Sequence, residues 1–312
     1  GFIMVHHAYW AQVVLLLCYG LLDMPLVVVA KQCTKVPKGG APQTGMPSQW
    51  TSQCEQDKMI HHLLGHQEGG FYVDLAANDY EHLSNTYVLD HHFGWQGICI
   101  EGNPTYIHNL EKHRRCAVVQ TAVDTYPGQL VEFRVDNGAH GGMVGDDLDN
   151  SGNAGERVQL RTRTLEEILD THCAPPVMDY LSLDVEGAEW RVLQRFAFDR
   201  YTFRIITIER PSNALNNLLE DNGYLYLGVQ GGSIMDAVYA HSSFWETSKA
   251  TIGDYFVKLQ HTHKLSMVPP LIMGLKCPSY PPRAPHPPAL RAVPSVGGAS
   301  DPGQFLTLNG VD

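Results

Sequence analysis

The chain has 312 residues, of which 44% are hydrophobic and 18% are charged, so it is long enough to bury a large core. Its net charge is −11, from 22 basic and 33 acidic residues. Because a phosphate backbone needs a basic face, this charge argues against a general nucleic-acid-binding protein. The seven cysteines contain no CxxC pair, which argues against a structural zinc site.

The first 47 residues are expected to lie outside the folded domain. Residues 10–30 are mostly apolar and about as long as a membrane span, although Asp23 and Pro25 interrupt them. We interpret this stretch as a membrane anchor or a cleaved signal peptide, which implies membrane association and an endomembrane or secretory location. The alternative is a stretch that packs on the domain of a cytoplasmic protein. A linker rich in Lys, Pro and Gly follows, up to residue 47.

The segment 71–101 has the pattern of a strand, a loop, a helix and a second strand. The first apolar run, Phe71–Leu75, contains Asp74, and apolar side chains recur at helical spacing over residues 83–93. The second apolar run ends in Glu101. This order is typical of the nucleotide-binding half of a doubly wound fold, in which an acid at the end of the second strand accepts hydrogen bonds from the ribose hydroxyls.

Strands and helices continue to alternate in the rest of the domain. A helix is expected within residues 48–66, and Thr164 and Ser212 are expected to cap later helices, with Glu167 completing a capping box. Residues 138–155 are rich in Gly, Asp and Asn and are expected to form a loop. Further strands are expected at residues 116–123, 131–135, 157–163, 179–185, 204–208, 224–229 and 254–259. Such alternation predicts a parallel sheet with helices on both faces.

The end of the chain has a different composition from the domain. Ten prolines follow Met267, and a packed sheet cannot accommodate them. Residues 263–312 are therefore expected to form a disordered, Pro-rich tail, which leaves residues 48–262 as the folded domain.

The cysteines give two expectations. Cys99 and Cys116 lie in apolar runs and are expected to be buried thiols. Cys33 and Cys54 flank a loop-rich stretch and could pair in an oxidising compartment, which the sequence does not decide.

Six segments together resemble the FkbM-type S-adenosylmethionine-dependent methyltransferases. They are SQCEQDK (52–58), VDLAAND (73–79), HLSNTYVL (82–89), GWQGICIEGNP (94–104), DYLSLDVEGAE (179–189) and ITIER (206–210). The resemblance covers residues 48–259 and implies an α/β, Rossmann-like class I methyltransferase fold. That fold has a mostly parallel seven-stranded sheet, a reversed last hairpin and helices on both faces. The resemblance also implies S-adenosylmethionine as cofactor and a hydroxyl of a glycan or small molecule as methyl acceptor.

The resemblance assigns the cofactor site by position. The expected cofactor-binding residues are Asp74, Ala76 and Asn78 at the methionine end, Glu101 at the ribose, and Ala122 and Val123 beside the adenine. The family usually has glycines where this chain has Ala76 and Tyr80, and their loss could narrow the site. The alternative function is therefore a catalytically inactive binding module with a methyltransferase fold.

Three acids, Asp184, Glu186 and Glu209, are the expected catalytic residues. They lie at or just after the ends of two strands, and ligands of open α/β sheets bind at the carboxyl ends of strands. Asp184 or Glu186 would orient or deprotonate the acceptor hydroxyl for an in-line methyl transfer, and His82 and His140 are weaker candidates for a base. The three acids could also hold a divalent metal, which the sequence does not decide. A nicotinamide-dependent oxidoreductase is disfavoured, because no GxGxxG follows the first strand.

Overall fold

The structure is a computed structural model that describes residues 33–230 and 236–248. The predicted N-terminal apolar stretch, the Pro-rich tail and the strand expected at 254–259 lie outside these residues. In the described ranges, no helix has both the length and the apolar character needed to cross a bilayer.

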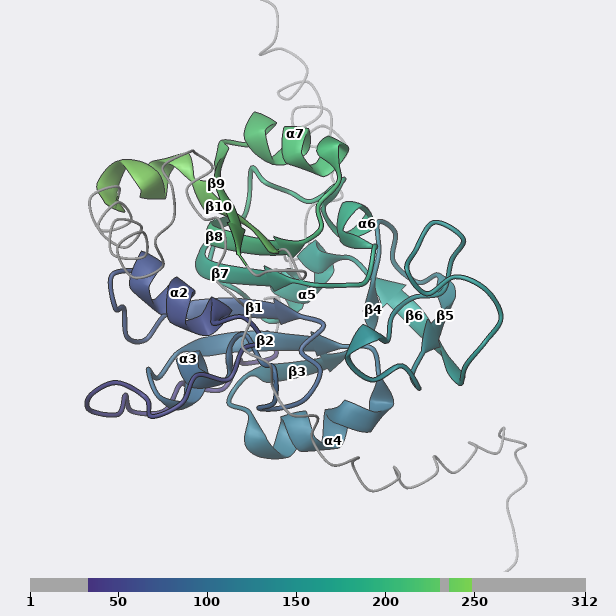
Figure 1. Ribbon diagram of the computed structural model, residues 1–312, viewed down its shortest axis with the longest axis horizontal. Coiled ribbons are helices and arrows are strands. Elements are labelled where there is room, and N and C mark those ends of the chain that lie inside the picture. The colour runs from purple at the N-terminus through teal and green to yellow at the C-terminus, as the bar shows by residue number, and fades with distance from the viewer. Residues whose placement is uncertain (1–32, 231–235, 249–312) are drawn as a thin grey trace, which may run out of the picture.

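A seven-stranded sheet forms the centre of the domain (Figure 1). Its strands are β1 (Phe71–Leu75), β2 (Gln96–Glu101), β3 (Ala117–Gln120), β7 (Val177–Leu183), β8 (Thr202–Glu209), β9 (Tyr224–Gln230) and β10 (Asp236–His241). They are arranged in the order β3-β2-β1-β7-β8-β10-β9. The first five strands in this order pair in parallel, whereas β10 runs antiparallel to both β8 and β9. This confirms the mostly parallel sheet and its reversed last hairpin.

Helices cover both faces of the sheet, as the alternation of strand side chains requires. In β1, Val73 and Leu75 pack in one core and Tyr72 packs in the other. The first core is completed by α5 (Leu165–Thr171), α6 (Glu189–Leu193) and α7 (Asn213–Asp221). The second is completed by α2 (Gln56–Leu63), α3 (Tyr87–His91) and α4 (Pro104–His113). Residues 242–248, after β10, are also helical.

A second sheet of three strands stands at the carboxyl ends of β1 and β2 (Figure 1). It contains β4 (Ala122–Val123), β6 (Arg157–Arg163) and β5 (Leu130–Arg134), and β6 pairs with both of the others. The single strand expected at 116–123 is therefore wrong. The chain leaves the main sheet at Thr121, whose hydroxyl donates to the carbonyl of Arg161 in β6 at 2.9 Å. Between β5 and β6 lies the predicted loop, which holds a short 3-10 turn, Gly138–His140, and isolated bridges at Met143, Val144 and Asn150.

The helix caps predicted from the sequence are confirmed, whereas the helix predicted after the first strand is shorter than expected. Thr164 and Glu167 form the predicted capping box, and Ser212 caps α7 by accepting from the amide of Leu215. The helix expected over 83–93 is only Tyr87–His91. Leu83 has φ of 62°, which a helix cannot contain, and it forms an isolated bridge instead.

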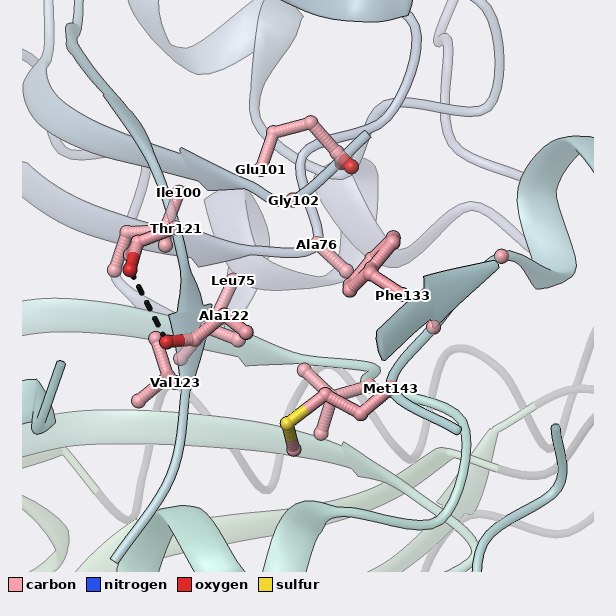
Figure 2. A pocket seen from close by; sticks show the side chains of 13 residues that line it. Leu75, Ala76, Ile100, Glu101, Gly102, Thr121, Ala122, Val123, Phe133 and Met143 are labelled. Carbon is pink, nitrogen blue, oxygen red and sulfur yellow. Dashed lines mark hydrogen bonds between the residues drawn. The ribbon is translucent and has the colours of Figure 1, made fainter. Parts of the chain in front are cut away.

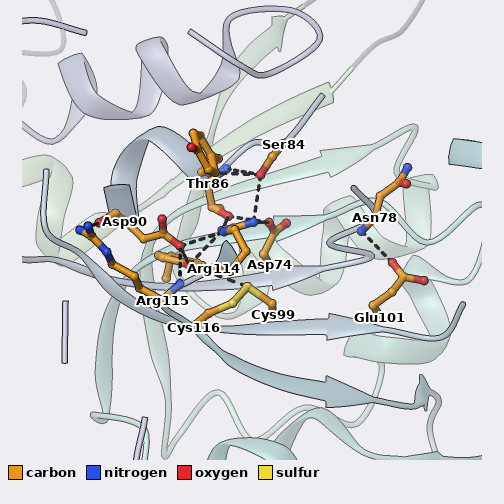
Figure 3. The surroundings of a disulfide bond; sticks show 12 residues. Asp74, Asn78, Ser84, Thr86, Asp90, Cys99, Glu101, Arg114, Arg115 and Cys116 are labelled. Atoms are coloured by element: carbon orange, nitrogen blue, oxygen red, sulfur yellow. Dashed lines mark hydrogen bonds and ion pairs between the residues drawn. A yellow bond between two sulfur atoms is a disulfide. The ribbon is translucent and has the colours of Figure 1, made fainter. Parts of the chain in front are cut away.

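The cysteines pair differently from expectation. Cys99 and Cys116 form a disulfide and are not free thiols (Figure 3). The parallel pairing of β2 with β3 brings their Cα atoms to 5.8 Å. Cys33 is bonded to Cys173 and not to Cys54, which is also disulfide-bonded. The Cys33–Cys54 pair that the sequence left open does not form, because the segment that contains Cys33 lies beside the residues that follow α5.

Candidate active site

An apolar pocket lies where β1 and β2 end and the second sheet begins (Figure 2). Ala122 and Val123 of β4, the two residues expected beside the adenine, line it. Figure 2 shows Phe133 and Met143 on the side of the pocket opposite Val123. The sequence did not indicate these two side chains, because Phe133 reaches the pocket from β5 of the second sheet and Met143 from the loop after β5. Their apolar surfaces make a slot that suits a flat aromatic base.

Glu101 lies in the wall of this pocket and organises the loop after β1. One carboxylate oxygen accepts from the amide of Asn78 at 2.7 Å (Figure 3). The other accepts from the amide of Asn103 at 2.6 Å. Burial raises the pKa of Glu101 to about 7, although these amides oppose the shift. Glu101 thus joins the ends of β1 and β2 and presents a carboxyl group to the pocket.

Asp74 belongs to a buried polar network (Figure 3). Thr86 donates its hydroxyl proton to Asp74 at 2.5 Å, and the guanidinium of Arg114 lies 3.9 Å from the same carboxylate. Arg114 is fully buried and donates to Asp90 at 2.8 Å and to the Tyr72 hydroxyl at 2.9 Å. Burial raises the pKa of Asp74, and the charge of Arg114 opposes that rise. The role of Arg114 in this network was not predicted from the sequence, because Arg114 lies in a polar turn before β3.

A polar pocket adjoins the apolar one at Ala76, which lines both. Asp74, Asp184 and Asp236 line it, and among the described residues that do so there is no Lys, Arg or His. Two enclosed oxygens of its lining residues, Asn85 Oδ1 and Asp184 Oδ1, have no hydrogen-bond partner in the described part of the chain. Three carboxyl groups and two unmatched acceptors favour a cationic ligand that donates hydrogen bonds.

Asp236 is a pocket residue that sequence reasoning missed. It opens β10, which was not predicted, and the antiparallel register places it beside Glu209. Burial raises its pKa to about 6, while Gln56 Nε2 donates to its carboxylate at 2.8 Å. Burial also raises the pKa of Asp184 well above its ordinary value, and the nearby charges of Glu209 and Asp236 raise it further.

A third pocket lies beyond the ends of β7 and β8 and is mainly polar. It is lined by Asn137, His140, Asp149, Asn150, Glu186, Glu209 and Arg210. Carboxylate oxygens of Asp149, Glu186 and Glu209 lie within 4.8 Å of one another, a spacing that could hold a metal ion. Arg210 Nη2 lies among them, 2.8 Å from Glu209, 3.5 Å from Glu186 and in contact with Asp149.

The structure thus divides the predicted catalytic acids between two neighbouring pockets. Glu186 and Glu209 meet Asp149 and Arg210, whereas Asp184 lines the polar pocket beside Asp74. The sequence left open a metal site made by Asp184, Glu186 and Glu209. In the structure the three acids close enough to share a metal are Asp149, Glu186 and Glu209. Burial raises the pKa of Glu186 to about 7, with Glu209 adding to the rise.

Ala76 and Tyr80, which stand where the family usually has glycine, differ in their position relative to the pockets. Ala76 takes the left-handed backbone, with φ of 70°, at a point shared by two pockets. Tyr80 stacks on His113, with ring centroids 4.5 Å apart, and does not line the three pockets described here. Of the two histidines considered as bases, His140 lines the third pocket, whereas His82 lines none of the three.

The strand order, the reversed last hairpin and the adjoining pockets at the carboxyl edge define a class I S-adenosylmethionine-dependent methyltransferase. Residues 74–226 match the family model described as the methyltransferase FkbM domain. This segment is therefore an FkbM-type, S-adenosylmethionine-dependent methyltransferase domain.

Comparison with solved structures finds distant methyltransferases. A precorrin-6y C5,15-methyltransferase from Geobacter metallireducens GS-15 is 12% identical, with a TM-score of 0.36, over 64% of this chain and 93% of that one. The METTL16 methyltransferase domain is 13% identical, with a TM-score of 0.36, over 59% of this chain and 65% of that one. A SAM-dependent methyltransferase from Aquifex aeolicus is 10% identical, with a TM-score of 0.33, over 60% of this chain and 89% of that one. No curated protein matches the chain.

Proposed function

We propose that this chain transfers a methyl group from S-adenosylmethionine to a hydroxyl oxygen of a glycan or small molecule. The observation that carries the proposal is the junction of the apolar pocket with the polar, carboxylate-lined pocket at Ala76. An adenosine needs the first environment, and a sulfonium with an ammonium group needs the second. The cofactor, when bound, supplies an electrophilic methyl group.

The chain's own residues divide the work by pocket. Ala122 and Val123 would hold the adenine, Glu101 the ribose, and Asp74 with the loop through Ala76 and Asn78 the methionine end. Asp184, Glu186 and Glu209 would orient the acceptor hydroxyl and accept its proton. The raised pKa of Glu186, about 7, suits a group that takes and returns a proton near neutral pH.

The third pocket supports a neutral, polyhydroxylated acceptor. Its amide, carboxylate and guanidinium side chains offer both donors and acceptors, while three carboxylates around one arginine repel an anion. The disulfides support an oxidising compartment, and we propose an endomembrane or secretory location on that ground. A glycan acceptor suits such a compartment.

The test is methyl transfer from radiolabelled S-adenosylmethionine to a pool of neutral glycans, with and without EDTA. We expect label on sugar oxygens. Mass spectrometry after chemical methylation with CD3 groups can locate the sites, because an enzymatic CH3 differs in mass from each CD3 added afterwards. Transfer that EDTA abolishes and Mg²⁺ or Mn²⁺ restores would assign a metal to the trio. Cofactor binding without transfer to any hydroxyl compound would instead support the alternative, a methyltransferase fold that has become a binding module.

A further inference from the structure

Asn85 lines the polar pocket, but the proposed function gives it no part in binding or catalysis. It lies in the loop between β1 and α3 and lines the pocket together with Asp74 and Asp184. Its Nδ2 donates to the Ser182 hydroxyl in β7 at 3.0 Å, which fixes the plane of the amide. Its Oδ1 is enclosed and has no hydrogen-bond partner among the described residues.

Unpartnered, enclosed side-chain oxygens are rare in this domain. In residues 33–230 and 236–248, five enclosed side-chain atoms have no partner, and only Asn85 Oδ1 and Asp184 Oδ1 are oxygens. Both belong to residues that line the same pocket. Because an enclosed acceptor without a donor is unfavourable, two of them at one pocket indicate a missing donor.

The acids of the pocket favour a missing donor that carries positive charge, although Arg114 offsets part of the charge of Asp74. Asp74, Asp184 and Asp236 line the pocket, and no basic side chain of the described chain does so. A carboxylate or phosphate would meet these acids at close range, whereas a primary ammonium offers three donors and offsets their charge.

We infer that Asn85 Oδ1 is an acceptor for the α-ammonium of the cofactor's amino-acid part. This assignment depends on the proposed orientation of the cofactor and adds a binding residue to it. Asn85 holds the ammonium together with the carboxylates of the pocket, while Ser182 holds the amide in place. Amino-acid recognition and adenosine recognition are then carried by separate pockets that meet at Ala76.

Two ligands separate this role from a structural one. S-adenosylhomocysteine contains the α-ammonium, and 5′-methylthioadenosine lacks the amino-acid part. We expect Asn85→Leu to bind S-adenosylhomocysteine about tenfold to a hundredfold more weakly by calorimetry, with 5′-methylthioadenosine affected less than twofold. Asn217→Leu, a substitution at an exposed position of α7 that lines none of the three pockets, should change neither affinity.

A second variant, Asn85→Asp, tests whether the Asn85 side chain accepts a hydrogen bond from the cofactor or donates one to it. Asn85→Asp keeps an acceptor and adds negative charge, so it should retain or strengthen S-adenosylhomocysteine binding. A large loss in Asn85→Asp would mean that the amide donates to the cofactor's carboxylate, and would overturn the assignment. Equal weakening of both ligands by Asn85→Leu would likewise overturn it, as would unchanged binding. If the unmutated protein binds neither ligand, the proposed cofactor orientation fails, which is a different result. Should Asn85→Leu not fold, Asn85→Ser serves the same comparison.

Discussion

Five residues other than glycine hold left-handed backbone in the loops that follow β1, β7 and β8. Their φ angles are 70° at Ala76, 53° at Asn78, 62° at Leu83, 54° at Glu186 and 43° at Arg210. All five line the pockets at the carboxyl edge of the sheet. Left-handed backbone is unfavourable for residues with a Cβ, and such strain tends to occur at functional sites.

Ala76 offers a direct test of this strain. Ala76→Gly should raise the free energy of unfolding by about 1 kcal/mol, because glycine takes positive φ without a steric penalty. Cofactor affinity should be kept or improved, since a smaller residue opens the junction of the two pockets. Differential scanning calorimetry and a cofactor titration measure the two effects. The adjacent Ala77→Gly is the matched control and should destabilise, because Ala77 is buried and has no positive φ.

Substitution of Asp184 distinguishes a role in methyl transfer from a role in cofactor binding. If it orients the acceptor, Asp184→Asn should lower kcat by about 10²–10⁴-fold, the range for a positioned acid or base. Cofactor affinity should change little, since Asp74 and Glu101 remain. The control is Asp179→Asn at the opposite end of β7, where the acid pairs with Arg204, and it should lower stability without a comparable loss of kcat. Loss of cofactor binding in Asp184→Asn would make it a cofactor residue instead.

At the scale of elements, one loop connects the three pockets. The segment 137–150 between β5 and β6 contributes Ala139 to the polar pocket, Met143 to the apolar pocket, and Asp149 to the third. Two ion pairs hold it to the core, from Asp147 to Arg191 in α6 and from Asp149 to Arg210. The amide of Asp149 also donates to the carbonyl of Glu186 at 3.1 Å. Under the proposed function, acceptor recognition depends on this loop, which the sequence marks only by its composition.

The sequence predicted the parts of the site that lie on regular parallel strands. Asp74 and Glu101 end apolar runs, so their place at the carboxyl edge follows from the strand pattern. Asp149 and Asp236 could not be found this way. Asp149 reaches the site through a loop and a second sheet, and Asp236 through an antiparallel strand whose register the sequence does not encode locally. The Cys99–Cys116 bond was missed for a similar reason, because it depends on which strands are neighbours.

The Cys99–Cys116 disulfide joins β2 to the segment just before β3. Replacing both residues by alanine should lower the free energy of unfolding by about 3 kcal/mol, the usual effect of removing a cross-link that closes a loop of this size. Urea unfolding followed by fluorescence measures the loss, with the unmutated protein kept oxidised as the reference. Alkylation of both thiols in the native, unreduced protein would show that the bond is absent.

For the whole molecule, buried carboxyls at one edge predict a specific pH dependence. Burial raises the pKa of Glu101 and Glu186 from 4.5 to about 7 and that of Asp236 from 3.8 to about 6. A carboxyl whose folded pKa is raised stabilises the fold fully below its unfolded pKa, and this contribution is lost as pH rises through the folded value. These groups should therefore make the cofactor-free protein less stable as pH rises from about 5 to 7.

A cationic cofactor should reverse part of this trend. Because the ionised acids attract it, its stabilising effect should grow over the same pH range. Thermal shift assays between pH 5 and pH 8, with and without S-adenosylmethionine, measure both trends. A cofactor effect that is independent of pH would contradict a carboxylate-lined methionine site.

In the proposed complex, one cofactor spans the apolar and the polar pocket and passes Ala76. A crystal structure with S-adenosylhomocysteine would test this arrangement. We expect adenine between Val123 and Phe133, ribose hydroxyls on Glu101, and the amino-acid part beside Asp74 and Asn85. Adenine in the polar pocket, or a ligand bound away from both pockets, would contradict it.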